Sequence, residues 1–93
     1  MITVIATVRA KPGKGPELEA DFRAWAAVVK QKEPGTLMYT LSRSREDPEL
    51  YYALETYADD AAVQAHMANF RARPPGPDIA AGPPQIMVLD KVV

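Results

Sequence analysis

Three side chains in this sequence could act together in proton transfer: the single histidine, His66, and Glu55 and Tyr57. Imidazole is the side chain that ordinarily exchanges its proton near neutral pH, so His66 is the first candidate for a general base. A carboxylate such as Glu55 can act as a second base or can orient the histidine. A phenol such as Tyr57 can donate a hydrogen bond to a substrate oxygen. The three residues therefore predict acid–base chemistry on a phenolic or enolic compound.

Each of these residues also has a structural interpretation. His66 would then be a helix histidine hydrogen-bonded to a neighbour or to water, and Tyr57 a core aromatic residue whose hydroxyl reaches the surface. Glu55 is expected in the middle of a strand, and a buried carboxylate needs a partner or a raised pKa. For Glu55 we favour a salt bridge with one of three arginines, Arg9, Arg23 or Arg43, within the chain or across a dimer.

Several apolar side chains are expected in the core, where they would also suit a flat aromatic substrate: Phe22, Trp25, Met38, Met67 and Phe70. Tyr39 is expected to pack within the sheet or at an interface. Asn69 is expected to cap the end of a helix. Arg71 and Arg73 could bind an anionic group at a pocket mouth, although arginines of this kind are more commonly solvated.

Composition excludes several classes of protein. The chain has 93 residues, no cysteine and one histidine, which predicts a single domain over residues 1–93 without disulfides or a protein metal site. A net charge of −1 gives no attraction for nucleic acid or an anionic membrane. The apolar N-terminal run is short and is interrupted by Arg9 and Lys11, so we expect a strand in a cytoplasmic protein and no signal peptide.

Hydrophobic periodicity predicts six elements in the order strand, helix, strand, strand, helix, strand. Pro16 and the Glu33-Pro34-Gly35 turn bound the first helix, and Asp59 or Asp60 begins the second. The predicted strands cover residues 2–9, 36–43, 50–57 and 85–92, and the helices cover residues 16–32 and about 60–70. This order is that of a ferredoxin-like α+β fold, with a four-stranded antiparallel sheet and both helices on one side.

The predicted strands carry apolar residues on both faces, and two helices can cover only one of them. A chain of this length has no further element for the other face, so we expect a homodimer. Five prolines between residues 74 and 84 exclude a continuous helix there. We interpret this stretch as a fixed wall, with a lid as the alternative.

Several short motifs follow one another along the chain: Met1-Ile2, Val4-Ile5-Ala6, Lys11-Pro12-Gly13-Lys14, Glu33-Pro34-Gly35-Thr36-Leu37 with Tyr39, Asp47-Pro48, Glu55-Thr56-Tyr57-Ala58-Asp59 and Val63-Gln64-Ala65-His66-Met67. In this order and at these separations they resemble the antibiotic biosynthesis monooxygenase (ABM) domain over residues 1 to about 73, and the resemblance resumes at the last strand. The resemblance implies a dimeric α+β barrel, in which two sheets pack face to face and each subunit has a pocket between sheet and helices. Relatives include quinol and anthrone monooxygenases that need no metal or flavin, haem-degrading enzymes and isomerases.

The sequence departs from the family pattern at positions that bear on haem. Tyr57 stands where a tryptophan is frequent, the first strand has no asparagine, and the usual position of the axial histidine has none. We therefore expect no haem degradation. The resemblance implies a cofactor-independent monooxygenase acting on a small hydroxylated aromatic or quinol-type substrate, with His66 as base. A non-oxidative isomerase or cyclase, and a dimeric module that binds small molecules without catalysis, are the alternatives.

Overall fold

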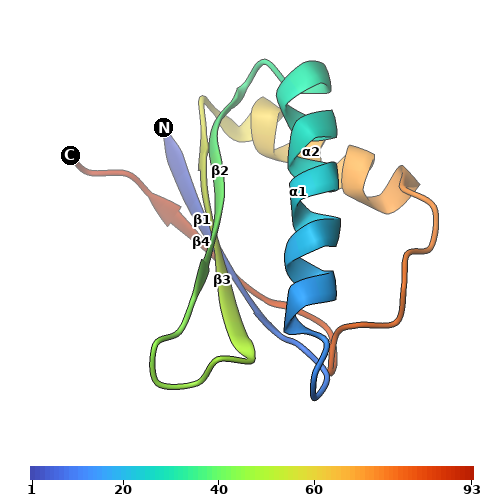
Figure 1. The fold of residues 1–93 in the computed structure, drawn as a ribbon. Coiled ribbons are helices and arrows are strands. Elements are labelled where there is room, and N and C mark those ends of the chain that lie inside the picture. The colour runs from blue at the N-terminus through green and yellow to red at the C-terminus, as the bar shows by residue number, and fades with distance from the viewer.

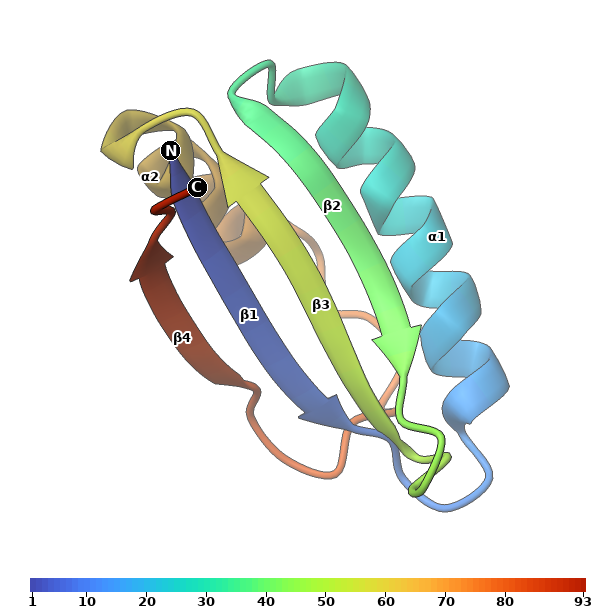
Figure 2. The same ribbon diagram turned by 90° about the vertical axis from the view of Figure 1, so that its left-hand side faces the viewer.

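The computed structural model of residues 1–93 has the predicted element order. The elements are β1 (Ile2–Arg9), α1 (Gly15–Lys32), β2 (Thr36–Arg43), β3 (Leu50–Tyr57), α2 (Asp60–Ala72) and β4 (Gln85–Asp90). All strand pairs are antiparallel, in the order β2-β3-β1-β4. Both helices lie on one face of the sheet, and no element of the chain covers the other face (Figures 1 and 2). The ferredoxin-like fold is thus confirmed.

The helix ends follow from the sequence. Pro16 lies in the first turn of α1, and Lys30 and Lys32 lie in its last turn, where cations are favourable. The side chain of Asp59 caps α2 by accepting a hydrogen bond from the backbone N–H of Ala62 at 2.9 Å. α2 extends two residues beyond the predicted end, and β4 ends two residues before it. None of the helices is both long and apolar enough to cross a membrane.

The alternation of β3 determines which polar groups enter the interior. Tyr51, Ala53, Glu55 and Tyr57 are all buried, and the residues between them lie on the uncovered face. Glu55 and Tyr57 therefore lie beneath the helices. The core forms two small clusters, one around Tyr51 and one around Tyr57, at opposite ends of this strand.

β2 contains an irregularity near its start. Thr36 pairs with Tyr57 and Met38 with Thr56, so Leu37 is an extra residue in the ladder. The bulge leaves half of the surface of Leu37 exposed. From Met38 onward the alternation is regular, so Met38 lies on the uncovered face of the sheet and Tyr39 lies on the side of the helices.

The proline-rich segment after α2 has no helix, as expected. It passes around the helical layer before entering β4 (Figure 1). Near its end Ile79 is buried, and its carbonyl accepts a hydrogen bond from the backbone N–H of Lys11 at 2.8 Å. Ala81 donates to the carbonyl of Arg9 at 2.8 Å. The segment is therefore bound to the sheet at its far end.

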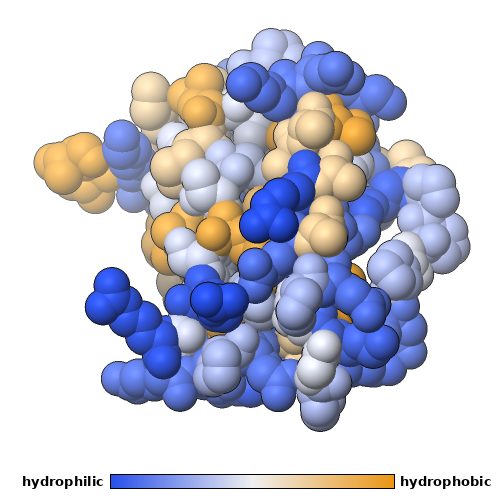
Figure 3. All heavy atoms as spheres, viewed as in Figure 1, coloured by the Kyte–Doolittle hydropathy of each residue, from blue (hydrophilic) through white to orange (hydrophobic).

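The uncovered sheet face carries exposed apolar side chains. Met38 is 41% exposed, Met87 55% and Leu89 40%. In the edge-on view of Figure 3, hydrophobic residues appear along the sheet side and at the projecting C-terminus, whereas the loops at the bottom of the molecule are hydrophilic. Apolar surface that is contiguous over a sheet face commonly marks an interaction site.

Candidate functional site

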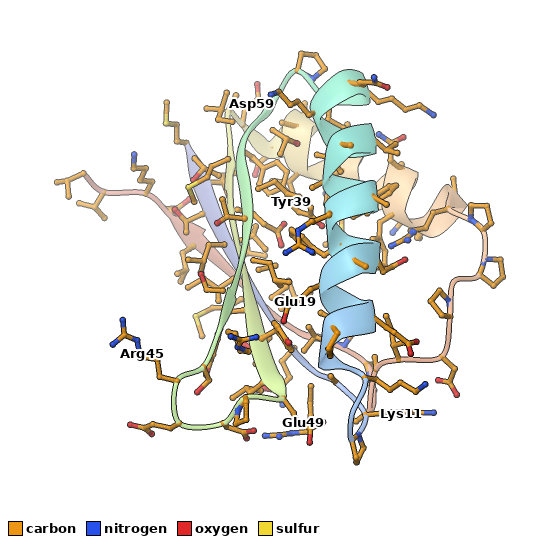
Figure 4. The ribbon with its side chains drawn as sticks, in the orientation of Figure 1. Lys11, Glu19, Tyr39, Arg45, Glu49 and Asp59 are labelled. Atoms are coloured by element: carbon orange, nitrogen blue, oxygen red, sulfur yellow. The ribbon has the colours of Figure 1, made fainter.

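A cavity of about 490 Å³ lies between the helices and the sheet. Its wall includes the aromatic side chains of Phe22, Trp25 and Tyr39 and the polar side chains of Glu55 and His66. Figure 4 shows Tyr39 in the layer between the sheet and α1. Because it combines an apolar wall with a few converging polar groups, the cavity is the best candidate for a ligand site.

His66 projects from the inner face of α2 and is buried. Its Nδ1 lies 2.8 Å from Oε1 of Glu33, and its Nε2 lies 3.9 Å from Oε1 of Glu55. Because an ionised carboxylate can only accept, the Glu33 contact places a proton on Nδ1. In the neutral ring Nε2 then carries the lone pair, and it has no hydrogen-bond partner within the protein. His66 is therefore oriented as a base toward the cavity.

Glu33 was not found as a site residue from the sequence, where it was interpreted only as part of the turn that ends α1. It is buried, and its carboxylate accepts hydrogen bonds from His66, from Thr36 Oγ1 at 2.8 Å and from Asn69 Nδ2 at 3.2 Å. Asn69, expected to be a helix cap, holds this carboxylate instead. One signal was available, because an acidic residue is unfavourable at the negative end of a helix.

Glu55 and Tyr57 lie beside each other on β3. The hydroxyl of Tyr57 donates a hydrogen bond to Oε1 of Glu55. Burial raises the pKa of the Glu55 carboxyl, and the hydrogen bond from Tyr57 partly opposes this shift. Burial also raises the pKa of Tyr57. The side chain of Tyr57 is 1% exposed and does not line the cavity, so a direct contact with substrate, as expected from the sequence, does not fit.

Within the chain, the predicted salt bridge between Glu55 and an arginine is wrong. Each of the three candidate arginines has another acidic partner: Arg9 pairs with Asp47, and Arg23 and Arg43 pair with Glu19. The basic side chain that lies near Glu55 is instead His66, whose Nε2 is 3.9 Å from Oε1 of Glu55. Arginine was expected because the sequence does not indicate which charged side chains lie on the same side of the sheet as Glu55.

Tyr39 is a second residue whose position was not anticipated. It was expected to pack within the sheet, but its ring stacks on Phe22 with centroids 4.9 Å apart and lies 5.1 Å from the ring of His66. Trp25 Nε1 donates to the Tyr39 hydroxyl at 3.1 Å. Burial and the nearby Glu55 carboxylate raise the pKa of Tyr39, so its own proton remains available for donation.

Four of the five side chains expected in the pocket wall do line the cavity: Phe22, Trp25, Met67 and Phe70. Met38 does not, because it neighbours Tyr39 in β2, and successive residues of a strand lie on opposite faces of the sheet. Residues 73–80 of the proline-rich segment also contribute to the wall. No set of three His, Asp or Glu side chains is arranged to hold a metal ion.

An oriented imidazole, a phenol donor and a second buried carboxyl group can together remove a proton and stabilise the resulting anion.

A sequence model of the antibiotic biosynthesis monooxygenases matches residues 1–73, and the chain belongs to this family. No protein of curated function matches the chain.

Solved structures support the same assignment. A protein from Caulobacter crescentus, named as a candidate antibiotic biosynthesis monooxygenase, is 36% identical, with a TM-score of 0.81 over 99% of this chain and 90% of its own. PA3566 from Pseudomonas aeruginosa is 32% identical, with a TM-score of 0.78 over 99% of this chain and 94% of its own. The haem-degrader MhuD from Mycobacterium tuberculosis is 26% identical, with a TM-score of 0.77 over 100% and 97% of the two chains.

Proposed function

We propose that the protein is a cofactor-independent monooxygenase that acts on a small hydroxylated aromatic or quinol-type substrate. One observation carries the proposal: Glu33 holds His66 so that Nε2 faces a cavity lined by aromatic side chains. The flat rings of Phe22, Trp25 and Tyr39 suit a planar substrate.

In the proposed reaction, Nε2 of His66 removes a proton from an activated C–H group of the substrate, next to the hydroxylated ring. Glu33 stabilises the imidazolium through its contact with Nδ1. The hydroxyl of Tyr39 donates to the oxyanion that develops on the substrate. Tyr57 acts indirectly, as a positioning residue that holds Glu55.

Oxygen then reacts with the substrate itself. The carbanion passes one electron to O₂, and the resulting substrate radical and superoxide combine to form a C–O bond. The peroxide anion takes the proton held by the imidazolium and becomes a hydroperoxide. Loss of a second proton from the same carbon, with cleavage of the O–O bond, releases water and leaves a carbonyl group. One oxygen atom enters the product and the other enters water, so no external reductant is required.

Haem fits this site less well, although MhuD is described with two haems in its active site. His66 is the only histidine and is therefore the only imidazole that could bind haem iron. Its Nε2 lies 3.9 Å from the Glu55 carboxylate and would have to turn toward the iron. Its other nitrogen is engaged by Glu33. The buried carboxyl groups on both sides of the imidazole favour proton transfer.

A non-oxidative isomerase is the second candidate. It is favoured by Glu55, because a carboxyl group with a raised pKa beside a histidine provides a second position for a proton. Turnover without oxygen would identify this alternative. A binding module without catalysis has less support, because the site contains both a cavity and titratable groups with perturbed pKa values.

We also propose that the uncovered sheet face joins two copies of the chain. Half-buried Ile5, Tyr52 and Leu54 continue the exposed apolar surface of Met38 and Met87 across this face. In the dimeric barrel that the family implies, the sheets of two subunits pack against each other and remove this surface from water.

Oxygen consumption with a panel of quinols and anthrones tests the proposal. We expect uptake with at least one compound and its loss, by about 10²–10⁴-fold, in His66→Ala. Gln64→Ala is the matched control, because Gln64 is exposed on the same helix and does not line the cavity. If no compound gives uptake above the His66→Ala background, the oxygenase proposal is refuted. Conversion at an unchanged rate under anaerobic conditions would establish the isomerase.

A further inference from the structure

Arg73 is the only arginine or lysine that lines the cavity. It follows α2 and precedes Pro74, and its guanidinium carbon lies 4.8 Å from the centroid of the Trp25 ring. Nη2 of Arg73 donates to Oδ1 of Asp21 at 3.0 Å. Stacking on one residue of α1 and a hydrogen bond to another fix the guanidinium at the cavity wall.

Most of the hydrogen-bonding capacity of Arg73 is unused. A guanidinium has five N–H donors, and Asp21 accepts only one of them. The side chain lines the cavity and is 25% exposed, so the donors that Asp21 does not use are available to a ligand. A planar guanidinium group with free N–H donors can form two parallel hydrogen bonds with the two oxygens of a carboxylate.

Trp25 determines how far Arg73 lies from the proposed base. Its ring centroid is 4.8 Å from the Arg73 guanidinium carbon and 6.3 Å from the His66 ring centroid, so the two groups are at most about 11 Å apart. A ligand that contacts both groups can therefore be no longer than about one substituted aromatic ring.

We infer that Arg73 selects aromatic substrates that carry a carboxylate group, a specificity that rests on the proposed function of the cavity. The reacting group of the substrate lies at His66, the ring lies against Trp25, and the carboxylate is bound by Arg73. Asp21 orients the guanidinium and also competes with the ligand for it, because both are anions.

Two ligands of the same shape test the inference: 4-hydroxy-1-naphthoate and its neutral amide, 4-hydroxy-1-naphthamide. Isothermal titration calorimetry of the full chain is expected to show about 10- to 100-fold tighter binding of the carboxylate. Arg73→Gln should reduce this preference to within about 3-fold. Arg71→Gln is the matched control, because Arg71 is exposed in the last turn of α2. Asp21→Asn should increase the preference.

The outcomes separate this inference from the proposed function. If the wild-type protein binds the two compounds equally, or if Arg73→Gln keeps the preference, the role of Arg73 is refuted while the aromatic cavity stands. If neither compound binds, the proposed substrate site fails, and the inference fails with it. Arg73→Lys keeps the positive charge but lacks the paired N–H donors of the guanidinium group, so it should retain only part of the preference for the carboxylate. The wild-type comparison decides the question even where a variant does not fold.

Discussion

The replacement of Glu33 by glutamine removes one charge from the site and keeps its shape. Oε1 of Glu33 accepts from both His66 and Thr36, and an amide oxygen at that position can do the same. The new NH₂ group would face Asn69, which is half-buried and can turn its own amide to accept. The hydrogen bonds are therefore preserved, and the measured effect of Glu33→Gln should come from the lost charge.

The size of this effect follows from the 2.8 Å contact between Glu33 and His66. Two unit charges whose centres are about 4 Å apart interact by about 4 kcal/mol at an effective dielectric constant of about 20. A proton that is half transferred in the transition state would lose about half of that stabilisation, about 2 kcal/mol. We therefore expect kcat to fall about 10- to 100-fold, with KM within about 3-fold of the wild-type value.

The assay is oxygen consumption with the best compound of the quinol and anthrone panel. Thr36→Val is the control, because it removes one hydrogen bond to the Glu33 carboxylate and leaves the charge in place. Its kcat should stay within about 3-fold of wild type. A folded Glu33→Gln protein whose kcat matches that of the wild type would show that Glu33 is only structural, and the reasoning would be refuted.

Three further predictions concern stability and assembly. The raised pKa of Glu55 means that the native state binds its proton more tightly than the unfolded chain, so wild-type stability falls as pH rises above about 4.5, by at most about 1.4 kcal/mol per pH unit. Glu55→Gln lacks this dependence. Denaturant unfolding from about pH 4 to about pH 8 should show that the free energy of unfolding of this variant increases with pH relative to that of the wild type. Gly35→Ala would place a methyl group 2.6 Å from the Ala62 side chain and should cost about 1–3 kcal/mol, a fall in Tm that calorimetry can measure; an unchanged Tm would mean that the turn relaxes freely. Leu54→Arg, at the centre of the uncovered face, should yield a folded monomer in sedimentation experiments where the wild type sediments as a dimer.

Local patterns predicted the elements of this fold because each element carries its own signals. The two-residue period of β3 places Glu55 and Tyr57 on one face, and helical spacing places His66 on the inner face of α2. The fold then determines that these faces meet. The prolines in residues 74–84 excluded a helix, and the chain is indeed irregular between α2 and β4.

The partners within the site could not be predicted in the same way. The side chain of Glu33 reaches His66 only because the chain turns back after α1, and the direction of that turn depends on tertiary packing. Tyr39 becomes a site residue because Trp25 donates a hydrogen bond to its hydroxyl across the contact between α1 and the sheet. The two residues belong to different elements, so no local sequence pattern indicates this contact. Met38 was misplaced because its apolar side chain suggested a pocket wall, whereas the regular alternation from Met38 to Tyr39 puts it on the face opposite the cavity.

The central claim is that Glu33 fixes the proton of neutral His66 on Nδ1 and leaves Nε2 as the base. Long-range proton–nitrogen NMR tests it directly, and the assignment is unambiguous because the chain has one histidine. At alkaline pH, where an imidazole is neutral, we expect a protonated Nδ1 and an unprotonated Nε2. A neutral ring with its proton on Nε2 would contradict the account.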